Sequence, residues 1–333
     1  MSAGAPLEVI VIAGGPSVEA EVSRASAAAV ARALEGAGHG VERLELDAEL
    51  GRALAGRGAA VAFPVTHGAL GEDGCLQGLL EVVGLPYVGS GVLAAALAAS
   101  KPAAKRAFAA AGLPLAAGAV VQRGEDLVGA ARRVRAELGP AVIVKPASGG
   151  SGIGVGRVGV DDADAALVAA LDAALADDAA ALVEALVFGD EVTCGVLEDD
   201  AGIPRALPPT LVRPLAADWY DFVSRYRPGG SEHVCPAPFE PGLLERIQRV
   251  AVAAHVALGA RDLSRCDFVV DAARGVDGVT LLELNALPGM TATSLFPEAA
   301  AVAGVGFGEL CDRLVRRAAR RGPRPPQRPR PLP

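Results

Sequence analysis

Lysine and asparagine are scarce in this chain of 333 residues. Only three of its 31 basic residues are lysines, namely Lys101, Lys105 and Lys145, and Asn285 is the single asparagine. The composition favours alanine, glycine, proline and arginine instead. Under such a bias, a remaining lysine or asparagine is a good candidate for a position whose chemistry cannot be exchanged. Lys105, on an alanine-rich helix, also fits an ordinary surface charge.

Other absences exclude whole classes of protein. With 51% hydrophobic and 21% charged residues, the chain is too apolar to be disordered. The uncharged run 82–100 is interrupted by glycine and proline, so no membrane span is expected. Residues 1–6 lack the basic and apolar segments of a secretory signal. The five cysteines are scattered without a Cys-x-x-Cys pair, which favours reduced thiols in the cytoplasm and argues against a zinc site.

The net charge of −8 is unevenly distributed along the chain. Residues 316–333 carry seven arginines and no acidic residue, whereas the rest of the chain carries 24 basic and 39 acidic residues. An acidic body argues against nucleic acid as the main partner. The tail itself could bind nucleic acid or an acidic partner weakly, but its prolines favour a disordered spacer.

Apolar strands alternate with helices in the first part of the chain, which predicts an α/β fold with a doubly wound N-terminal domain. The strands expected there are 7–13, 41–46 and 59–65. Further on, the pattern becomes α+β in parts, with single strands expected at 118–122, 141–145 and 205–212. The predicted boundaries are 1–97 for the N-terminal domain, 98–187 for the central unit, 188–318 for the C-terminal unit and 319–333 for a disordered tail.

A hairpin is predicted near the end of the chain, and its pairing brings two carboxylates together. A turn centred on Gly275 would pair Asp271 with Val279 and therefore Asp267 with Glu283. Two directly opposed carboxylates repel each other unless a cation lies between them. Both are flanked by apolar residues typical of buried strands, where a charge needs a partner.

Asn285 and Arg265 extend this cluster. Each lies two residues from one of the carboxylates, Glu283 or Asp267, and therefore shares a strand face with it. Oxygen ligands with room for water suit Mg²⁺, so Asp267, Glu283 and Asn285 are predicted to bind it. The alternative, a solvated acidic face, fits the apolar flanks less well. Arg265 would neutralise an oxyanion or a carboxylate on the same side.

A loop of small residues follows the apolar strand that ends in Lys145. Its glycines, among them Gly150 and Gly152, would let backbone N–H groups approach phosphate oxygens, while the lysine adds a positive charge. A simple hairpin connection is the alternative. The pattern G-x-G-x-x-G at 154–159 would suggest an NAD-dependent oxidoreductase, but it follows a loop rather than a strand, which argues against that function.

Further candidates lie at strand ends and in loops. His67 ends a strand where α/β folds bind ligands, and Gly289 follows the predicted metal-binding strand. Glu184 and Glu191 could contact a nucleotide at a joint between domains, or they could be surface acids. The aromatic cluster 219–226 suggests a loop that closes over a ligand. The remaining histidines are expected to be structural: His39, His233 and His255.

Taken together, these motifs resemble the D-alanine–D-alanine ligases of the ATP-grasp superfamily. The resemblance covers residues 7–317, and its most specific segments are 13–23, 67–78 and 282–291. It implies a three-domain ATP-grasp fold and the ATP-dependent ligation of two D-alanines through an acyl phosphate, for peptidoglycan precursors. It also implies two Mg²⁺ ions, for which Mn²⁺ could substitute, and a cytoplasmic homodimer without nucleic-acid or membrane partners.

The resemblance assigns roles to individual residues. Glu19 would hold the ammonium group of the first D-alanine, with His67 nearby, and Ser151 and Tyr226 would link to Glu19 by hydrogen bonds. The oxyanion would be stabilised by Arg265 and the Gly289 amide. The second D-alanine would be bound by Arg225, Ser294 and the Leu295 amide. ATP would be bound by Lys101, Lys145, Gly150, Gly152, Glu184, Val187 and Glu191, and the metal by Asp267, Glu283 and Asn285.

The chain departs from the family pattern at several positions. Arg225 stands where a lysine is usual, which changes the geometry near the γ-phosphate and the second carboxylate. Ala185 and Leu186 replace a usual lysine and aromatic residue, so the packing around adenine differs. Tyr226, rather than phenylalanine, favours an amine over a hydroxy acid as the second substrate.

Two other functions remain open. An ATP-grasp ligase that makes a different dipeptide or a depsipeptide would tolerate these departures. A nucleotide-binding protein without catalytic activity would not need the complete set of predicted phosphate and metal contacts. That set, which argues against this second function, consists of Lys101, Lys145, Asp267, Glu283 and Asn285.

Overall fold

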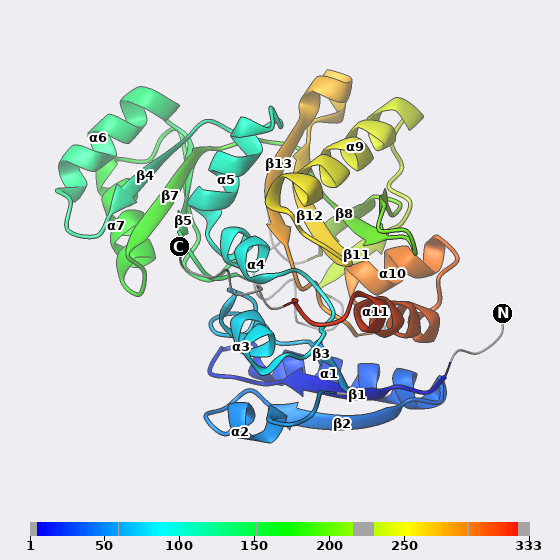
Figure 1. Cartoon of the computed structure of the whole chain (residues 1–333). Coiled ribbons are helices and arrows are strands. Elements are labelled where there is room, and N and C mark those ends of the chain that lie inside the picture. The colour runs from blue at the N-terminus through cyan, green and yellow to red at the C-terminus, as the bar shows by residue number, and fades with distance from the viewer. Residues whose placement is uncertain (1–4, 59, 151, 216–229, 292, 326–333) are drawn as a thin grey trace, which may run out of the picture.

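Three β-sheets with helices around them make up the computed structural model of the chain (Figure 1). The structure describes residues 5–58, 60–150, 152–215, 230–291 and 293–325. The N-terminal sheet lies at the bottom of Figure 1, the central sheet at the upper left and the third sheet at the right. Within the described residues, no helix is both long and apolar enough to cross a membrane.

The N-terminal unit is doubly wound, as predicted. Its parallel sheet has the order β2 (Gly40–Glu45), β1 (Glu8–Ala13), β3 (Ala60–Pro64). Alternate residues of β1 face opposite sides, because side chains along a strand alternate. Val9 and Val11 pack in one core with α1 (Ala20–Gly36) and α11 (Phe307–Arg321). Ile10 and Ile12 pack on the other side with α3 (Cys75–Val83) and α2 (Leu50–Leu54), a short helix that the sequence did not predict.

The central unit is an antiparallel sheet with two helices against it. The strand order is β4 (Gly118–Gln122), β7 (Ala180–Ala185), β5 (Val142–Pro146), β6 (Gly156–Val158). The helices α6 (Leu127–Leu138) and α7 (Asp164–Leu175) share a core with this sheet, in which Val121, Val134, Val144, Leu171 and Val183 are buried. The glycine loop connects β5 to β6 at one end of this sheet.

The third sheet has the order β11 (Ser231–Val234), β10 (Thr210–Pro214), β8 (Asp190–Glu198), β12 (Leu263–Val270), β13 (Val279–Asn285). The predicted single strand 205–212 is wrong: the structure has β9 (Pro204–Ala206) and β10 there. Pro208 and Pro209 separate the two, because proline has no N–H to donate to a ladder. The core of this unit contains α9 (Pro241–Leu258), and α10 (Leu295–Val302) contacts β8, with Phe296 close to Gly195.

The β12–β13 hairpin carries the predicted site residues in the predicted pairing. Asp267 lies opposite Glu283. The predicted pairing of Asp271 with Val279 is wrong by one residue, because Val270 is opposite Val279 and a register shift follows Asp267. This β-bulge restores the pairing at the carboxylates, since one extra residue on β13 compensates for the different turn.

Two helices that follow the N-terminal unit pack on the third sheet. These are α4 (Val92–Ala99) and α5 (Lys101–Ala110). Ala104 and Phe108 of α5 are buried in the core that β12, β13 and α9 form. Figure 1 shows α5 between the central sheet and β13. A helix that the sequence assigned to the central unit therefore has its buried side chains in the core of the third sheet.

Part of the predicted disordered tail is folded. Helix α11 continues to Arg321, and Arg324 forms an ion pair of 2.9 Å with Glu81 of α3. Arg321 donates hydrogen bonds to the carboxylate of Asp262 at 2.6 and 2.8 Å and to the carbonyl of Tyr87 at 2.6 Å. Residues 319–325 thus continue the fold onto the N-terminal unit.

Candidate active site

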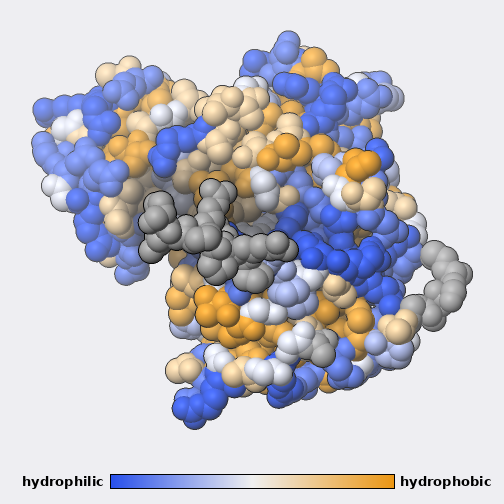
Figure 2. Space-filling model, in the orientation of Figure 1, coloured by the Kyte–Doolittle hydropathy of each residue, from blue (hydrophilic) through white to orange (hydrophobic). Residues whose placement is uncertain are grey.

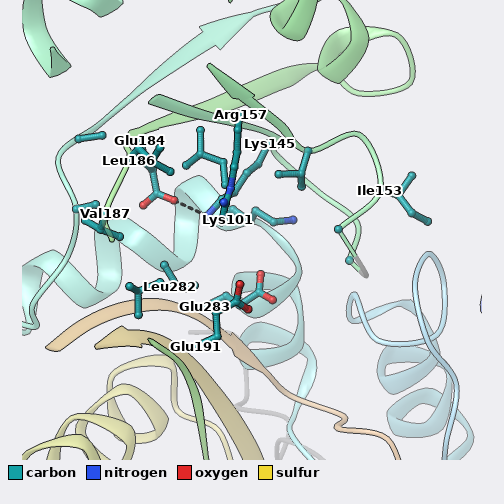
Figure 3. Close-up of a pocket in the computed structure, with 17 residues that line it drawn as sticks. Lys101, Lys145, Ile153, Arg157, Glu184, Leu186, Val187, Glu191, Leu282 and Glu283 are labelled. Atoms are coloured by element: carbon teal, nitrogen blue, oxygen red, sulfur yellow. Dashed lines mark hydrogen bonds and ion pairs between the residues drawn. The ribbon is translucent and has the colours of Figure 1, made fainter. Parts of the chain in front are cut away.

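A pocket lies between the central sheet and the third sheet (Figure 3). Lys145 of β5 and Glu184 of β7 line one side, and Leu282 and Glu283 of β13 line the other. We call it the nucleotide pocket, because every residue to which the resemblance assigns ATP binding lines it. These residues are Lys101, Lys145, Gly150, Gly152, Glu184, Val187 and Glu191. Their contacts with a nucleotide stay a prediction.

Two lysines hold the carboxylate of Glu184 in this pocket. Lys145 Nζ donates a hydrogen bond of 2.8 Å to Oε2, the dashed line in Figure 3, and Lys105 Nζ forms an ion pair of 2.6 Å with Oε1. Burial by itself would raise the pKa of Glu184, but the two ammonium groups outweigh it and hold that pKa below its ordinary value. Glu184 is therefore an ionised carboxylate that only accepts hydrogen bonds.

Lys105 is not the surface charge that the sequence allowed. Its side chain is only 12% exposed, and Nζ also donates a hydrogen bond of 3.0 Å to the carbonyl of Leu281 on β13. Burial lowers the pKa of Lys105, and the charge of Glu184 opposes that shift. The alanine-rich pattern of α5 gave no sign of this burial, because both partners come from distant strands. The scarcity of lysine was the one available signal.

Lys101 begins α5 and contacts the glycine loop. Its Nζ donates a hydrogen bond of 2.6 Å to the carbonyl of Gly149, and its backbone N–H donates one of 2.8 Å to Ala147. Burial lowers the pKa of Lys101, while the negative charge of Glu283 opposes the shift. Gly149 has a φ of +76°, a left-handed conformation that favours glycine, so the loop needs small residues for its shape.

Asp267 is the centre of the predicted metal site. Its carboxylate accepts hydrogen bonds from Thr193 Oγ1 at 2.7 Å, Arg265 Nε at 2.8 Å and Asn285 Nδ2 at 3.2 Å. Two carboxylates, with Glu283 opposite, and one amide oxygen suit a hard cation that takes its other ligands from phosphate and water. Among the described residues, no group of three His, Cys, Asp or Glu side chains is placed to hold a metal ion.

A second pocket adjoins the first, and Gly150 lines both. We call it the acceptor pocket. Its lining combines α1, the loop after β3, β12, and the segment from Asn285 into α10. The described residues that were implied for the amino-acid substrates all line it: Glu19, His67, Arg265, Gly289, Ser294 and Leu295. The sequence therefore located two adjacent groups of residues, and their roles in binding stay predictions.

His67 has a free polar atom in the acceptor pocket. Its side chain is nearly buried, and Nε2 has no hydrogen-bond partner among the described residues. Burial lowers the pKa of His67, although the nearby Glu19 opposes that shift, so the neutral imidazole is favoured. A buried ring nitrogen without a partner is costly, which is expected where a ligand completes the site.

Two glycines let the walls of the acceptor pocket approach closely. Gly68 has a φ of +73°, and a Cβ there would lie 2.8 Å from Ser17 Cβ and 3.9 Å from Glu19 Oε2. A Cβ at Gly289 would lie 3.0 Å from Ser294 Oγ. A larger residue at Gly68 would therefore displace Ser17, and one at Gly289 would displace Ser294, which was implied for the second D-alanine.

Glu72 is a member of the acceptor pocket that the sequence analysis missed. Its Oε1 accepts a hydrogen bond of 2.8 Å from the N–H of Gly68, and its side chain lines the pocket. Burial raises the pKa of Glu72 to about 7, and the negative charges of Glu19 and Glu283 contribute to the increase. It lies within the segment 67–78, so its place in that motif was the signal that could have identified it.

Two other residues line the pockets unexpectedly. Arg157 of β6 lines the nucleotide pocket. His233, which was expected to be only structural, lines the acceptor pocket and contacts Glu298 at 2.7 Å. The other two histidines agree with a structural role: His39 contacts Asp312 at 2.7 Å, and the buried His255 contacts Ser264 at 2.8 Å.

Some predicted residues lie outside the described part of the chain. They are Ser151, Arg225 and Tyr226, together with the rest of the aromatic cluster 219–226. The predicted hydrogen-bonded link to Glu19 and the predicted closing loop therefore stay predictions.

Comparison with solved structures shows the same fold. The D-alanine–D-alanine ligase of Bacillus anthracis, in a crystal structure complexed with ATP, superimposes with a TM-score of 0.80 over 94% of this chain and 98% of that chain, at 26% identity. The D-alanine–D-alanine ligase of Coxiella burnetii gives a TM-score of 0.80 at 24% identity and covers 95% of this chain and 94% of its own.

Sequence comparison gives the family. Residues 42–90 match the family described as D-ala D-ala ligase N-terminus, and residues 107–316 match D-ala D-ala ligase C-terminus. The D-alanine–D-alanine ligase of Ruegeria pomeroyi is 43% identical over 96% of this chain and 98% of its own length. That of Methylobacterium radiotolerans is 41% identical over 93% and 98%, respectively. The chain therefore belongs to the D-alanine–D-alanine ligase family, which has the ATP-grasp fold.

Proposed function

We propose that the two adjoining pockets carry out the reaction of the family, the ATP-dependent ligation of two D-alanines. The observation that carries this proposal is the shared boundary: Gly150 lines both pockets, Glu283 lines the nucleotide pocket, and Asn285 lines the acceptor pocket. ATP in the first pocket would place its terminal phosphate at this boundary, within reach of a carboxylate in the second.

The nucleotide pocket provides contacts for each part of ATP. Lys101 and Lys145 would bind the phosphates as positive charges, and the N–H groups of Gly150 and Gly152 would contact phosphate oxygens. The ionised Glu184 would accept a hydrogen bond from the amino group of adenine. Val187 and Glu191 also line this pocket; Val187 would pack on the adenosine, and Glu191 would accept hydrogen bonds from the ribose hydroxyls.

The acceptor pocket would orient the two amino acids. Glu19 and His67 would bind the first D-alanine, whose carboxylate attacks the γ-phosphate of ATP to form an acyl phosphate and ADP. Ser294 and the N–H of Leu295 would bind the carboxylate of the second. Its amine then attacks the acyl carbon, and phosphate leaves. Arg265 and the N–H of Gly289 would stabilise the oxyanion of the tetrahedral intermediate.

A divalent cation, Mg²⁺, belongs to this proposal. Asp267, Glu283 and Asn285 would hold it, and the fit rests on their oxygen donors and on the pairing of the two carboxylates. Bound Mg²⁺ would neutralise charge on the phosphates during transfer. Arg265, which donates to Asp267 at 2.8 and 2.9 Å, would keep that carboxylate oriented.

The oligomeric state and the location are proposed from the family as well. We place the chain in the cytoplasm as a homodimer in peptidoglycan precursor synthesis. Its five cysteines are all free thiols, which supports the proposed location.

An exposed apolar surface on α3 supports the proposed dimer. Apolar side chains gather in Figure 2 over the region that α3 occupies in Figure 1, and Val82 of α3 is 86% exposed. Sedimentation of the purified protein tests the dimer, which a monomer at micromolar concentration would contradict.

A panel of acceptors tests the proposed reaction against its alternatives. Release of ADP is measured with Mg·ATP and D-alanine, L-alanine, or D-alanine plus D-lactate. D-alanyl-D-alanine as the main product is expected. D-alanyl-D-lactate would instead indicate a depsipeptide ligase. ATP binding without turnover for any acceptor would indicate a nucleotide-binding protein.

A further inference from the structure

Two of the three lysines of the chain lie on one face of α5. Lys101 and Lys105 are four residues apart, and residues at this spacing are neighbours on a helix surface. Ala104 and Phe108, which lie on the same side of the helix as the two lysines, are buried in the core of the third sheet. Lys101 extends to the glycine loop of the central unit, and Lys105 extends to Glu184 of β7. The helix is thus joined to the central unit at two points.

Lys105 connects the two walls of the nucleotide pocket. Its ammonium group is 2.6 Å from Glu184 Oε1 on the central sheet and 3.0 Å from the carbonyl oxygen of Leu281 on β13. The side chains of Lys105 and Glu184 are 12% and 2% exposed, so the ion pair is shielded from water and salt. The contact with Leu281 is made to its backbone carbonyl oxygen, so this contact does not depend on the conformation of the Leu281 side chain.

The contacts of Glu184 divide its two oxygens between two cations. Oε2 accepts from Lys145, which lines the nucleotide pocket, and Oε1 pairs with Lys105. A carboxylate offers about four lone-pair sites, so both oxygens can still accept from a ligand. Because two cations lie beside it, the carboxylate of Glu184 is ionised and has no proton to donate. It can accept a hydrogen bond from an amino group of the ligand, whereas a carbonyl oxygen at the same position would be repelled.

We propose that Lys105 is a positioning residue that determines the base specificity of the nucleotide pocket, by holding Glu184 as a hydrogen-bond acceptor against β13. This inference rests on the proposed binding of adenosine beside Glu184. A 6-amino purine would donate to Glu184. A 6-oxo purine would place its carbonyl oxygen against the carboxylate and would be rejected.

The test compares ATP with inosine triphosphate in the full-length enzyme. Lys105→Met removes the cation while keeping most of the side-chain volume. The preference of this variant for ATP over inosine triphosphate is measured as the ratio of the two kcat/KM values. This ratio should fall by roughly tenfold or more, which corresponds to the loss of one hydrogen bond to a charged group. The loss should appear in KM for ATP, with KM for D-alanine unchanged. Lys105→Arg, which keeps the charge, should retain most of the preference.

Arg106 provides the matched control. It follows Lys105 on the same helix but is exposed, so Arg106→Met removes an equal charge without touching Glu184. This variant should keep the wild-type preference. Equal losses with ATP and inosine triphosphate in Lys105→Met, or the same change in Arg106→Met, would overturn the proposal.

Folding and turnover are controlled separately. If Lys105→Met precipitates, Glu184→Gln tests the same contact, and an unchanged preference in that variant overturns the proposal. If the wild type releases no ADP with D-alanine, the proposed function fails. The base preference is then measured by calorimetric binding of ATP and inosine triphosphate, which requires no turnover. Comparable affinities of the wild type for both nucleotides would overturn the specificity role by itself.

Discussion

At the residue scale, the acceptor side of the site depends on Arg265. It lies opposite Asn285 on the neighbouring strand, its guanidinium contacts both oxygens of Asp267 at 2.8 and 2.9 Å, and it lines the acceptor pocket. The proximity of Arg265 to Asp267 was predictable, because residues two apart on a strand share a face. The distances were not, since they depend on the rotamers of both side chains.

Replacing Arg265 should affect the transition state more than substrate binding. In Arg265→Ala, kcat should fall by about 10²–10³-fold, or about 3 kcal/mol, if the guanidinium stabilises the oxyanion. Arg265→Lys should recover only part of this, because lysine cannot contact both oxygens of Asp267 in the same way. Steady-state kinetics of both variants measure the effect. An increase in KM with unchanged kcat would instead assign Arg265 to ground-state binding.

Glu72 should make the stability of the protein depend on pH. Its pKa is about 7 in the folded protein, against 4.5 as the ordinary value. Between these two pH values the folded state keeps a proton that the unfolded chain has lost, so the free energy of unfolding decreases as pH rises. Urea denaturation from pH 4.5 to 8 should show a smaller decrease for Glu72→Gln than for the wild type. Identical pH dependence in the two proteins would contradict this assignment.

At the element scale, α11 joins the third sheet to the N-terminal unit through one buried carboxylate. Asp262 has a side chain with no exposed surface, and it accepts from Arg317 at 2.9 Å, Arg321 at 2.6 Å and the N–H of Gly89 at 2.8 Å. Its φ of +64° is a conformation in which aspartate and asparagine are tolerated better than most residues. This junction was not predictable from the sequence, because the partners of Asp262 are far away along the chain and residues 319–333 were expected to be a disordered tail.

Removing this carboxylate should destabilise the whole fold. Asp262→Ala removes the carboxylate partner of Arg321 and one of the two carboxylates that pair with Arg317, the other being Glu198, at a cost of about 3 kcal/mol. Asp262→Asn should cost less, because it keeps the shape and tolerates the backbone conformation. The control is Asp200→Asn, which breaks an exposed pair with Arg320 and should change the free energy of unfolding by less than about 1 kcal/mol. Equal effects of Asp262→Ala and Asp200→Asn would contradict the role of the junction.

The secondary structure was largely predictable from the sequence, and the exceptions have local causes. The parallel strands of the N-terminal unit and the β12–β13 hairpin follow from apolar runs and turn residues. The bulge after Asp267 was not predictable, because it depends on how the 3₁₀ turn 272–278 closes. The short strand β11 and helix α2 were missed because segments of four or five residues carry too little periodicity.

At the scale of the whole molecule, the two pockets form between units whose separate folds can be predicted from local sequence patterns. How these units pack against one another cannot be predicted from such patterns. Motifs identified about half of the lining residues of each pocket, because each motif is local. Lys105 and Glu72 were missed, because their importance comes from residues on other elements, Glu184 for the first and Glu19 for the second. The local sequence does not show such contacts, although the position of Glu72 within the segment 67–78 and the scarcity of lysine were available as indirect signals.

The most direct test of the account follows oxygen atoms through the reaction. The purified protein is incubated with Mg·ATP and D-alanine labelled with ¹⁸O in its carboxylate, and the masses of phosphate and dipeptide are measured. An acyl phosphate requires the first D-alanine to lose one labelled oxygen, so phosphate should carry one ¹⁸O and D-alanyl-D-alanine should carry three. Unlabelled phosphate, or ADP release without this dipeptide, would contradict the account.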